Sequence, residues 1–248
     1  MIDVSRTIDH VAGVIDGAPV RDDPFHHLVF SSAFPADVYA ALLDAMPERG
    51  DYGRMSGRAK ASARTKVDLF PEGVMRLPRD KKAVWGAIGQ VLRSPRLRDA
   101  WVRRLSPGLE RRFGSRHGSV DFYATPILTR DVPGYRIGIH PDTRWKAITV
   151  QIYLPPDDSI SHVGTVFHRR DSDGRFQAAA RMSFVPNTGY AFAVAGDTWH
   201  SVDVVGPEVG TRDSIILTYF VDEGWLRVAQ NRCKRLGYLA RGLGWRRA

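Results

Sequence analysis

Residues 117–222 consist of short apolar runs separated by turns rich in Pro, Gly and Asp. This pattern limits the possible folds of the chain more than any other feature of the sequence. The runs have the length of β-strands, and some alternate with period two, as Tyr135, Ile137 and Ile139 do. Many short strands divided by turn residues are typical of a jelly roll. The sequence therefore predicts a mainly β fold with flanking helices, in which residues 117–222 form a jelly-roll core.

The flanking regions follow other patterns. Residues 1–116 are expected to be a mainly helical support region with one early strand around residues 28–30. Helices are predicted over residues 35–47, 81–92 and 97–113. Residues 49–66 hold several Gly, Ser and Ala, so we expect either a surface loop or a lid over a functional site. A C-terminal helix with a basic tail is expected over residues 223–248, and the chain as one structural domain.

Composition limits the setting of the protein. The 248 residues include one cysteine, Cys233, which excludes an internal disulfide framework and fits a reducing compartment. Residues 1–17 carry charges throughout and lack the apolar centre of a signal peptide. No stretch is long and apolar enough to span a bilayer. We therefore expect a soluble, cytoplasmic protein.

The chain is basic, with 36 Lys and Arg against 27 Asp and Glu and a net charge of +9. Most of the excess lies in residues 53–66, 95–116 and 231–248, outside the predicted core. Basic runs can follow phosphates, but no zinc pattern or RNA-binding aromatic motif accompanies these. The charge favours solvated helix faces and an anionic small-molecule substrate, steered inward by a basic rim, over nucleic acid.

Two histidines and one aspartate stand beside the predicted strands. His140 ends an alternating run, Asp142 follows two residues later, and His200 lies between two strand-like runs. Side chains two apart at a strand end can turn toward one point. A His-x-Asp tripeptide alone more often marks a turn, but two imidazoles and a carboxylate in this setting match the facial triad that holds non-haem Fe(II). Asp203, three residues after His200, is a candidate to orient the His200 ring.

A fourth polar residue, Arg212, follows His200 by twelve positions and opens an apolar strand. Its planar guanidinium can hold a carboxylate through two parallel hydrogen bonds, which Lys cannot do. An arginine in this place is the group needed to hold the remote carboxylate of a keto acid bound at the iron.

Further motifs surround these four residues. Residues 146–154 read Lys-Ala-Ile-Thr-Val-Gln-Ile-Tyr-Leu, residues 164–167 read Gly-Thr-Val-Phe, and a Gly turn at residues 187–190 leads toward Trp199 and His200. With them the sequence resembles the 2-oxoglutarate/Fe(II) dioxygenases of the prolyl-hydroxylase-like branch. The resemblance covers roughly residues 119–222, and residues 24–47 more loosely. One departure is Val163-Gly164, where many members have Gly-Gly.

The resemblance implies a double-stranded β-helix, which is a jelly-roll or cupin-like barrel, braced by N-terminal and C-terminal helices. It also implies Fe(II), 2-oxoglutarate as co-substrate and O2. Tyr153 and Arg212 would bind the distal carboxylate of 2-oxoglutarate, and the Arg-x-Ser triplet adds Ser214 to that group. The implied reaction releases succinate and CO2.

The expected function is hydroxylation of an unactivated C–H bond in a small or carrier-bound substrate, such as an amino acid, a sugar or a natural-product intermediate. Desaturation and cyclisation stay open, whereas Asp142 occupies the iron position that a halogenase needs for halide. Lys146, Arg144 and Trp199 are candidates for substrate binding, with a rim charge or wall packing as the alternative for each. The rival classes are a non-catalytic cupin-like metal-binding module and a metal-independent interaction protein.

Overall fold

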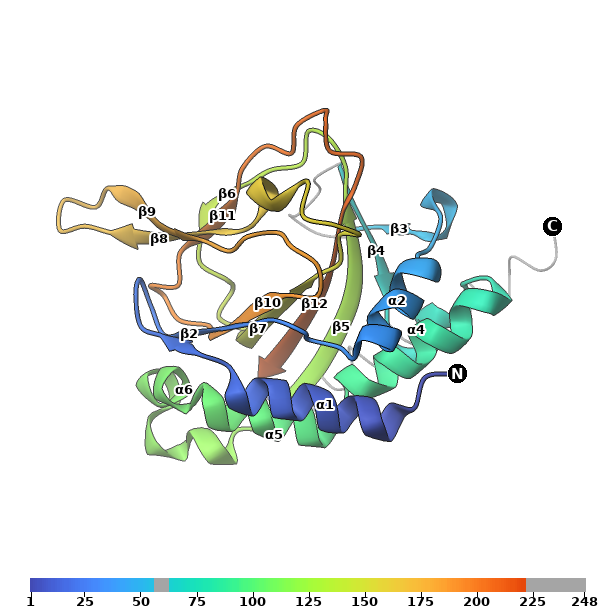
Figure 1. Cartoon of the computed structure of the whole chain (residues 1–248). Helices are drawn as coiled ribbons and strands as arrows, with labels where there is room; N and C mark the ends of the chain where they lie inside the picture. Colours follow the sequence, from blue (N-terminus) through green and yellow to red (C-terminus); the bar gives the residue numbers. More distant parts are fainter. Residues whose placement is uncertain (56–62, 222–248) are drawn as a thin grey trace.

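Two antiparallel sheets form the core of the protein (Figure 1). The computed structural model describes residues 1–55 and 63–221. The larger sheet has the order β1-β2-β10-β7-β12-β5-β4-β3, with bounds β1 Val20–Arg21, β2 His27–Phe30, β10 Gly189–Ala193, β7 Lys146–Tyr153, β12 Arg212–Val221, β5 Phe122–Asp131, β4 Arg64–Asp68 and β3 Gly53–Arg54. The smaller sheet has the order β6-β11-β8-β9, with bounds β6 Ile137–His140, β11 His200–Val202, β8 Val166–Arg170 and β9 Phe176–Arg181.

The two sheets pack face to face around an aromatic core. Phe167 and Val202 of the smaller sheet are buried in one cluster with Tyr153, Tyr190 and Phe192 of the larger sheet. This arrangement confirms the predicted jelly roll. The expectation of a barrel needs one correction, because the described strands form two separate hydrogen-bonded sheets and no closed barrel.

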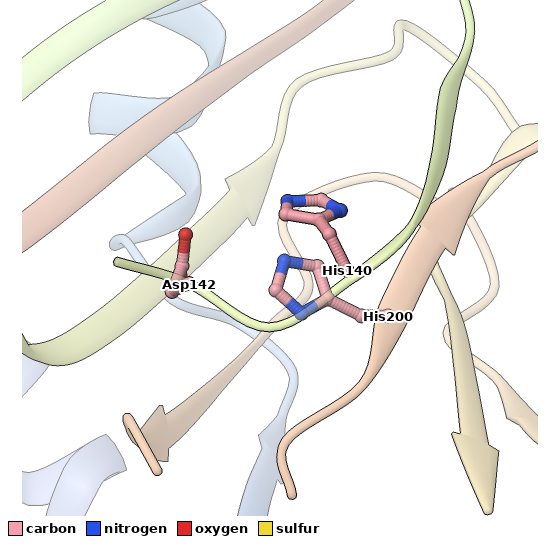
Figure 2. A group of neighbouring side chains, drawn as sticks. All are labelled: His140, Asp142 and His200. Atoms are coloured by element: carbon pink, nitrogen blue, oxygen red, sulfur yellow. The ribbon is translucent and has the colours of Figure 1, made fainter. Parts of the chain in front are cut away.

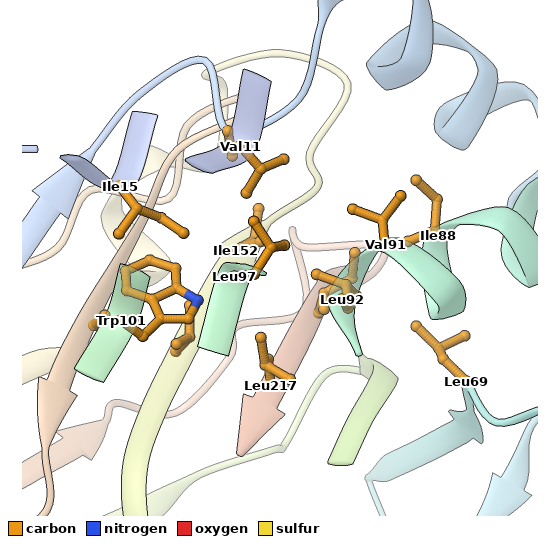
Figure 3. Packing of buried hydrophobic residues seen from close by; sticks show 14 of the residues in the cluster. Val11, Ile15, Leu69, Ile88, Val91, Leu92, Leu97, Trp101, Ile152 and Leu217 are labelled. Carbon is orange, nitrogen blue, oxygen red and sulfur yellow. The ribbon is translucent and has the colours of Figure 1, made fainter. Parts of the chain in front are cut away.

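Helices cover the other face of the larger sheet (Figure 1). Their bounds are α1 Val4–Gly17, α2 Ala36–Asp44, α3 Pro71–Val74, α4 Arg79–Leu92, α5 Pro95–Arg104 and α6 Ser106–Phe113, with short 3-10 turns at η1 Arg49–Asp51, η2 Gly114–Ser119 and η3 Ser161–Val163. Figure 3 shows how Ile15 of α1, Val91 of α4 and Trp101 of α5 pack with Ile152 and Leu217 of the sheet. The helices thus bury the sheet face that points away from the aromatic core.

Alternation along β7 explains how one strand serves both cores. Ile148, Val150 and Ile152 point into the helix-covered core. Thr149 and Gln151 lie on the opposite side of the strand, toward the smaller sheet, and both are buried and hydrogen-bonded. The polar residues of β7 therefore face the space between the sheets.

The N-terminal region holds more strands than the sequence predicted. Four strands, β1 to β4, lie within residues 1–116, where one was expected, and all belong to the larger sheet. The helix predicted over residues 97–113 is instead two, α5 and α6, because Pro107 near the start of α6 lacks an amide hydrogen and ends the preceding helix.

Two expected segments are only partly covered. The ends of the predicted loop 49–66 form η1 and the paired strands β3 and β4, and residues 56–62 lie outside the described residues. The predicted C-terminal helix and basic tail, 223–248, also lie outside them. Within residues 1–55 and 63–221, none of the helices has the length and apolar character needed to cross a membrane.

Candidate metal centre

Strand pairing places the two histidines opposite each other. His140 is the last residue of β6 and His200 the first of β11, and the two are direct partners in the antiparallel register, with ring centroids 4.4 Å apart. In each ring Nδ1 donates to a backbone carbonyl, that of Gly138 at 2.8 Å and that of Thr198 at 3.0 Å. Because a carbonyl can only accept, this tautomer leaves Nε2 of both rings free to bind a metal.

Asp142 completes the group from the loop after β6. Its carboxylate accepts hydrogen bonds from Lys146 Nζ at 2.5 Å and Thr149 Oγ1 at 2.6 Å, and its side chain is 6% exposed. Burial would raise the pKa of Asp142, but the Lys146 ammonium, His200 and the two hydrogen bonds outweigh it and lower the pKa to about 2. The carboxylate is therefore charged at neutral pH.

These three side chains meet between the sheets (Figure 2). One potential ligand atom from each of His140, Asp142 and His200 lies within 4.8 Å of the others. Burial lowers the pKa of His200, which favours the neutral ring that metal binding requires. Two imidazole nitrogens and one carboxylate are a ligand set that suits a divalent transition metal. The residues that the sequence predicted to be ligands are thus brought together.

Arg212 lies at the start of β12 and is fully buried. Its Nε donates to the Val163 carbonyl at 2.7 Å and its Nη1 to Asp131 at 2.8 Å. Nη2 is also buried, and it has no hydrogen-bond partner in the part of the chain that the structure describes. A buried guanidinium nitrogen without a partner is costly, so this atom is available to an anion.

A second arginine shares the same aspartate. Arg64 of β4 binds Asp131 through Nε at 2.5 Å and Nη2 at 2.7 Å. Arg64, Asp131 and Arg212 are direct neighbours across β4, β5 and β12. Two guanidiniums thus face one fully buried carboxylate, and the cluster retains one positive charge.

The polar face of β7 leads from the triad to this cluster. Thr149 binds Asp142, Gln151 follows on the same face, and Tyr153 lies third, with its ring centroid 5.7 Å from Cζ of Arg212. Burial raises the pKa of Tyr153, so its phenol stays protonated as a hydrogen-bond donor.

Ser214 and Tyr153 belong to one buried hydrogen-bond network. Gln151 donates to Ser214 Oγ at 2.9 Å and accepts from the Tyr190 hydroxyl at 2.6 Å. The Tyr153 hydroxyl donates to Thr165 Oγ1 at 3.1 Å. Ser214 is therefore linked to Tyr153 through Gln151 and Thr165, since Thr165 Oγ1 also contacts Gln151 Oε1 at 3.4 Å. The roles predicted for Tyr153, Ser214 and Arg212 toward a co-substrate stay predictions.

The three substrate-binding candidates lie in different places. Lys146 contacts Asp142, and Arg144 is exposed with its guanidinium over the ring of Trp145. Trp199 packs edge-on against Phe176, with ring centroids 4.9 Å apart. Their substrate roles also stay predictions.

One expectation about His200 is wrong. Asp203 does not orient its ring, because the Asp203 carboxylate pairs with Arg181 at 2.6 Å and the His200 ring is held by the Thr198 carbonyl.

Sequence reasoning missed part of this site. Gln151 lies two residues from both Thr149 and Tyr153, so the period of β7 could have singled it out. Asp131 and Arg64 gave no comparable signal, because their relation to Arg212 arises only from strand pairing across the sheet.

No protein-family model matches the sequence, and no curated protein matches it. Solved structures do match. A prolyl-4-hydroxylase from Pseudomonas putida aligns over 85% of this chain and 98% of its own, with a TM-score of 0.50 and 17% identity. A Trichoplax adhaerens prolyl hydroxylase, solved with a peptide fragment of the hypoxia-inducible factor oxygen degradation domain, aligns over 86% and 90%, with a TM-score of 0.56 and 12% identity.

A third match is an oxidoreductase of the 2OG-Fe(II) oxygenase family from Burkholderia pseudomallei, which aligns over 86% of this chain and 89% of its own, with a TM-score of 0.50 and 14% identity. The chain has the fold of these oxygenases. The likeness is one of fold, and it agrees with the double-stranded β-helix that the sequence motifs implied.

Proposed function

We propose that this protein is a 2-oxoglutarate-dependent Fe(II) oxygenase. His140, Asp142 and His200 would hold the iron, and the free Nε2 atoms of both rings and the charged Asp142 suit this ion. Lys146 and Thr149 orient the Asp142 carboxylate from two sides. Three protein ligands leave the remaining coordination positions for co-substrate and O2.

The observation that carries the proposal is that Nη2 of buried Arg212 has no hydrogen-bond partner among residues 1–55 and 63–221. Arg212 and Arg64 carry two positive charges, and Asp131 compensates one of them. A carboxylate bound at Nη2 of Arg212 would neutralise the other charge and give Nη2 a hydrogen-bond partner. 2-Oxoglutarate has two carboxylates, so one end can bind at the triad while the other reaches Arg212. Tyr153 lies beside Arg212, and its hydroxyl hydrogen, which donates to Thr165 Oγ1 in this structure, would turn to the same carboxylate when 2-oxoglutarate binds.

Bound iron would couple the oxidative decarboxylation of 2-oxoglutarate, giving succinate and CO2, to insertion of one atom of O2 into a substrate C–H bond. The protein fixes the geometry and keeps water out. Phe167, Phe184 and Phe192 are buried beside this polar track and exclude water from it. We propose a small or carrier-bound substrate, such as an amino acid, a sugar or a natural-product intermediate, with hydroxylation as the outcome.

Iron content tests the ligand assignment. His140→Ala and Asp142→Ala should each lose most of the Fe(II) that the wild type retains after anaerobic loading and desalting, because a triad lacks one ligand in each variant. His162→Ala is the matched control, since the His162 ring is exposed and, within the described residues, its ion-pair partner is Glu208 at 3.5 Å. Wild-type iron content in both ligand variants would overturn the assignment.

A further inference from the structure

A cavity of about 410 Å³ opens directly beside Asp142. Helix α6, the loop after β6 and the loop after β10 enclose it, and its lining includes Arg111, Arg112, Arg144 and Asp197. Its volume lies in the range of roughly 300–1,000 Å³ that is usual for small-molecule sites. A substrate bound here would lie next to the proposed iron.

Arg112 holds the walls of this cavity together. Its guanidinium donates to the carbonyls of Arg144 and Lys146 at the start of β7, and to the Val194 carbonyl after β10 at 2.9 Å. These bonds fix α6 to both loops. The two other arginines therefore project from walls whose positions are set by Arg112.

The cavity has a surplus of positive charge. In the part of the chain that the structure describes, neither Arg111 nor Arg144 forms an ion pair, and both are exposed. The Asp142 carboxylate is already neutralised by Lys146. Asp197 alone then faces three guanidiniums, which leaves a surplus of two positive charges.

A neighbouring cavity has the opposite character. It shares Arg111 but is otherwise lined by Asp22, Glu110, His26 and Pro107, so its charged groups are mainly acidic. An anion therefore prefers the cavity beside Asp142, where Arg111, Arg112 and Arg144 outnumber the carboxylate of Asp197.

We propose that the substrate carries a phosphate group, bound between Arg111 and Arg144 so that the rest of the molecule lies toward Asp142. A phosphate monoester is dianionic at neutral pH, which matches the surplus of two charges. Its three terminal oxygens can accept hydrogen bonds from two planar guanidinium forks at once, and its second negative charge, which a carboxylate lacks, matches the second arginine. This assignment rests on the proposed function, because it concerns the substrate of the same centre.

The test is equilibrium binding of phenyl phosphate, with benzoate and benzyl alcohol as monoanionic and neutral probes. Titrations use wild type, Arg111→Ala, Arg144→Ala and the double variant, each loaded anaerobically with Fe(II) and 2-oxoglutarate so that the triad and Arg212 are occupied. Arg98→Ala is the control, because it removes the same charge from an exposed arginine on α5 that pairs with Asp99.

The wild type should bind phenyl phosphate more tightly than either other probe. Each single variant should raise its dissociation constant about tenfold, the effect of losing one charge-assisted hydrogen-bonding partner, and Arg98→Ala should leave it unchanged. Equal binding by all five proteins, or no preference over benzoate, would overturn the proposal.

The iron content of the loaded wild type, measured beside this titration and beside a repeat on metal-free protein, separates this proposal from the proposed function. If the wild type retains no Fe(II) after anaerobic loading and desalting but still binds phenyl phosphate in an arginine-dependent way, the oxygenase assignment is overturned and the phosphate site stands. If the wild type binds iron and 2-oxoglutarate but its phenyl phosphate binding does not depend on Arg111 or Arg144, the phosphate site is overturned and the oxygenase assignment stands.

Discussion

Arg212 has a charged head that no water reaches, and two of its three nitrogens are already bonded to Val163 and Asp131. If the third binds the distal carboxylate of 2-oxoglutarate, Arg212→Ala should weaken 2-oxoglutarate binding by about 2–5 kcal/mol, the usual cost of truncating one partner of a buried charge pair. Iron content should stay near that of the wild type, because the triad is intact. Calorimetric titration with 2-oxoglutarate, beside metal analysis, measures both.

If Arg212 binds 2-oxoglutarate, the Arg212→Ala variant must lose 2-oxoglutarate affinity while it keeps its iron content. An equal loss of iron and 2-oxoglutarate binding in Arg212→Ala would mean that Arg212 only supports the fold. Asp131 retains its bidentate contact with Arg64 in this variant, so the carboxylate is not left alone.

Asp131 is the residue on which both arginines depend. Asp131→Asn leaves the buried guanidinium of Arg212 and the partly buried one of Arg64 without a counter-charge, so the free energy of unfolding should fall by about 3–5 kcal/mol. The control is Asp99→Asn, which removes the exposed partner of Arg98 and should cost less than about 1 kcal/mol. Urea denaturation of both variants gives the comparison. A small, equal effect in the two would show that the buried cluster is not a coupled unit.

At the residue scale, sequence reasoning succeeds where the signal is local. His140 and Asp142 are two residues apart at a strand end, and Arg212 opens an apolar strand, so their roles follow from spacing and chemistry. Asp131 is 81 residues from Arg212 and 67 from Arg64 along the chain. Only the pairing register of β4, β5 and β12 makes these three residues neighbours. Strand register cannot be predicted from one sequence alone.

At the element scale, strands with a clear apolar pattern were predictable and polar ones were not. The runs around β6, β7, β10 and β12 alternate or are strongly apolar, whereas five of the six residues of β9 are exposed and show no buried face. The sequence of β4, Arg-Thr-Lys-Val-Asp, has no apolar alternation. Its charged side chains are accommodated by ion pairs, Arg64 with Asp131 and Lys66 with Asp68. Its place in the sheet comes from pairing with β5.

Gly164 marks a close approach between elements and gives an element-scale prediction. A Cβ at this position would lie 1.6 Å from the carbonyl oxygen of Met182, where the segment after β9 passes η3. Gly164→Ala therefore forces backbone to move and should lower the free energy of unfolding by about 2 kcal/mol or more. Gly13→Ala is the control: nothing lies within 4 Å of its Cβ, and alanine in helix α1 should add up to about 1 kcal/mol.

Chemical denaturation of the two glycine variants distinguishes crowding from a general effect of adding a methyl group. Destabilisation of Gly164→Ala alone supports a required glycine, in the place where the sequence motif had Val163-Gly164 instead of Gly-Gly. Equal stability of the two variants would contradict it.

At the scale of the whole molecule, the two cores differ in composition. This difference explains why the fold class could be predicted from the sequence and the extent of the larger sheet could not. The helix-covered core is built from regularly spaced apolar residues, which the sequence displays. The core between the sheets combines aromatic rings with buried polar groups, so the strand faces that line it mix apolar and polar residues. Sheet closure depends on strand pairing, and the expected barrel is instead two facing sheets.

The reaction outcome that we propose also depends on the whole molecule, because Asp142 would occupy the iron position that a halogenase needs open for chloride. Asp142 is fixed by Lys146 and Thr149 and stays charged, so chloride cannot displace it easily. With Fe(II), 2-oxoglutarate and an accepted substrate under 18O2, the product should gain one labelled oxygen atom, even in high chloride. Mass spectrometry of the product reads this directly. A chlorinated product would refute the role of Asp142, and loss of two hydrogens without labelled oxygen would replace hydroxylation by desaturation or cyclisation while keeping the oxygenase.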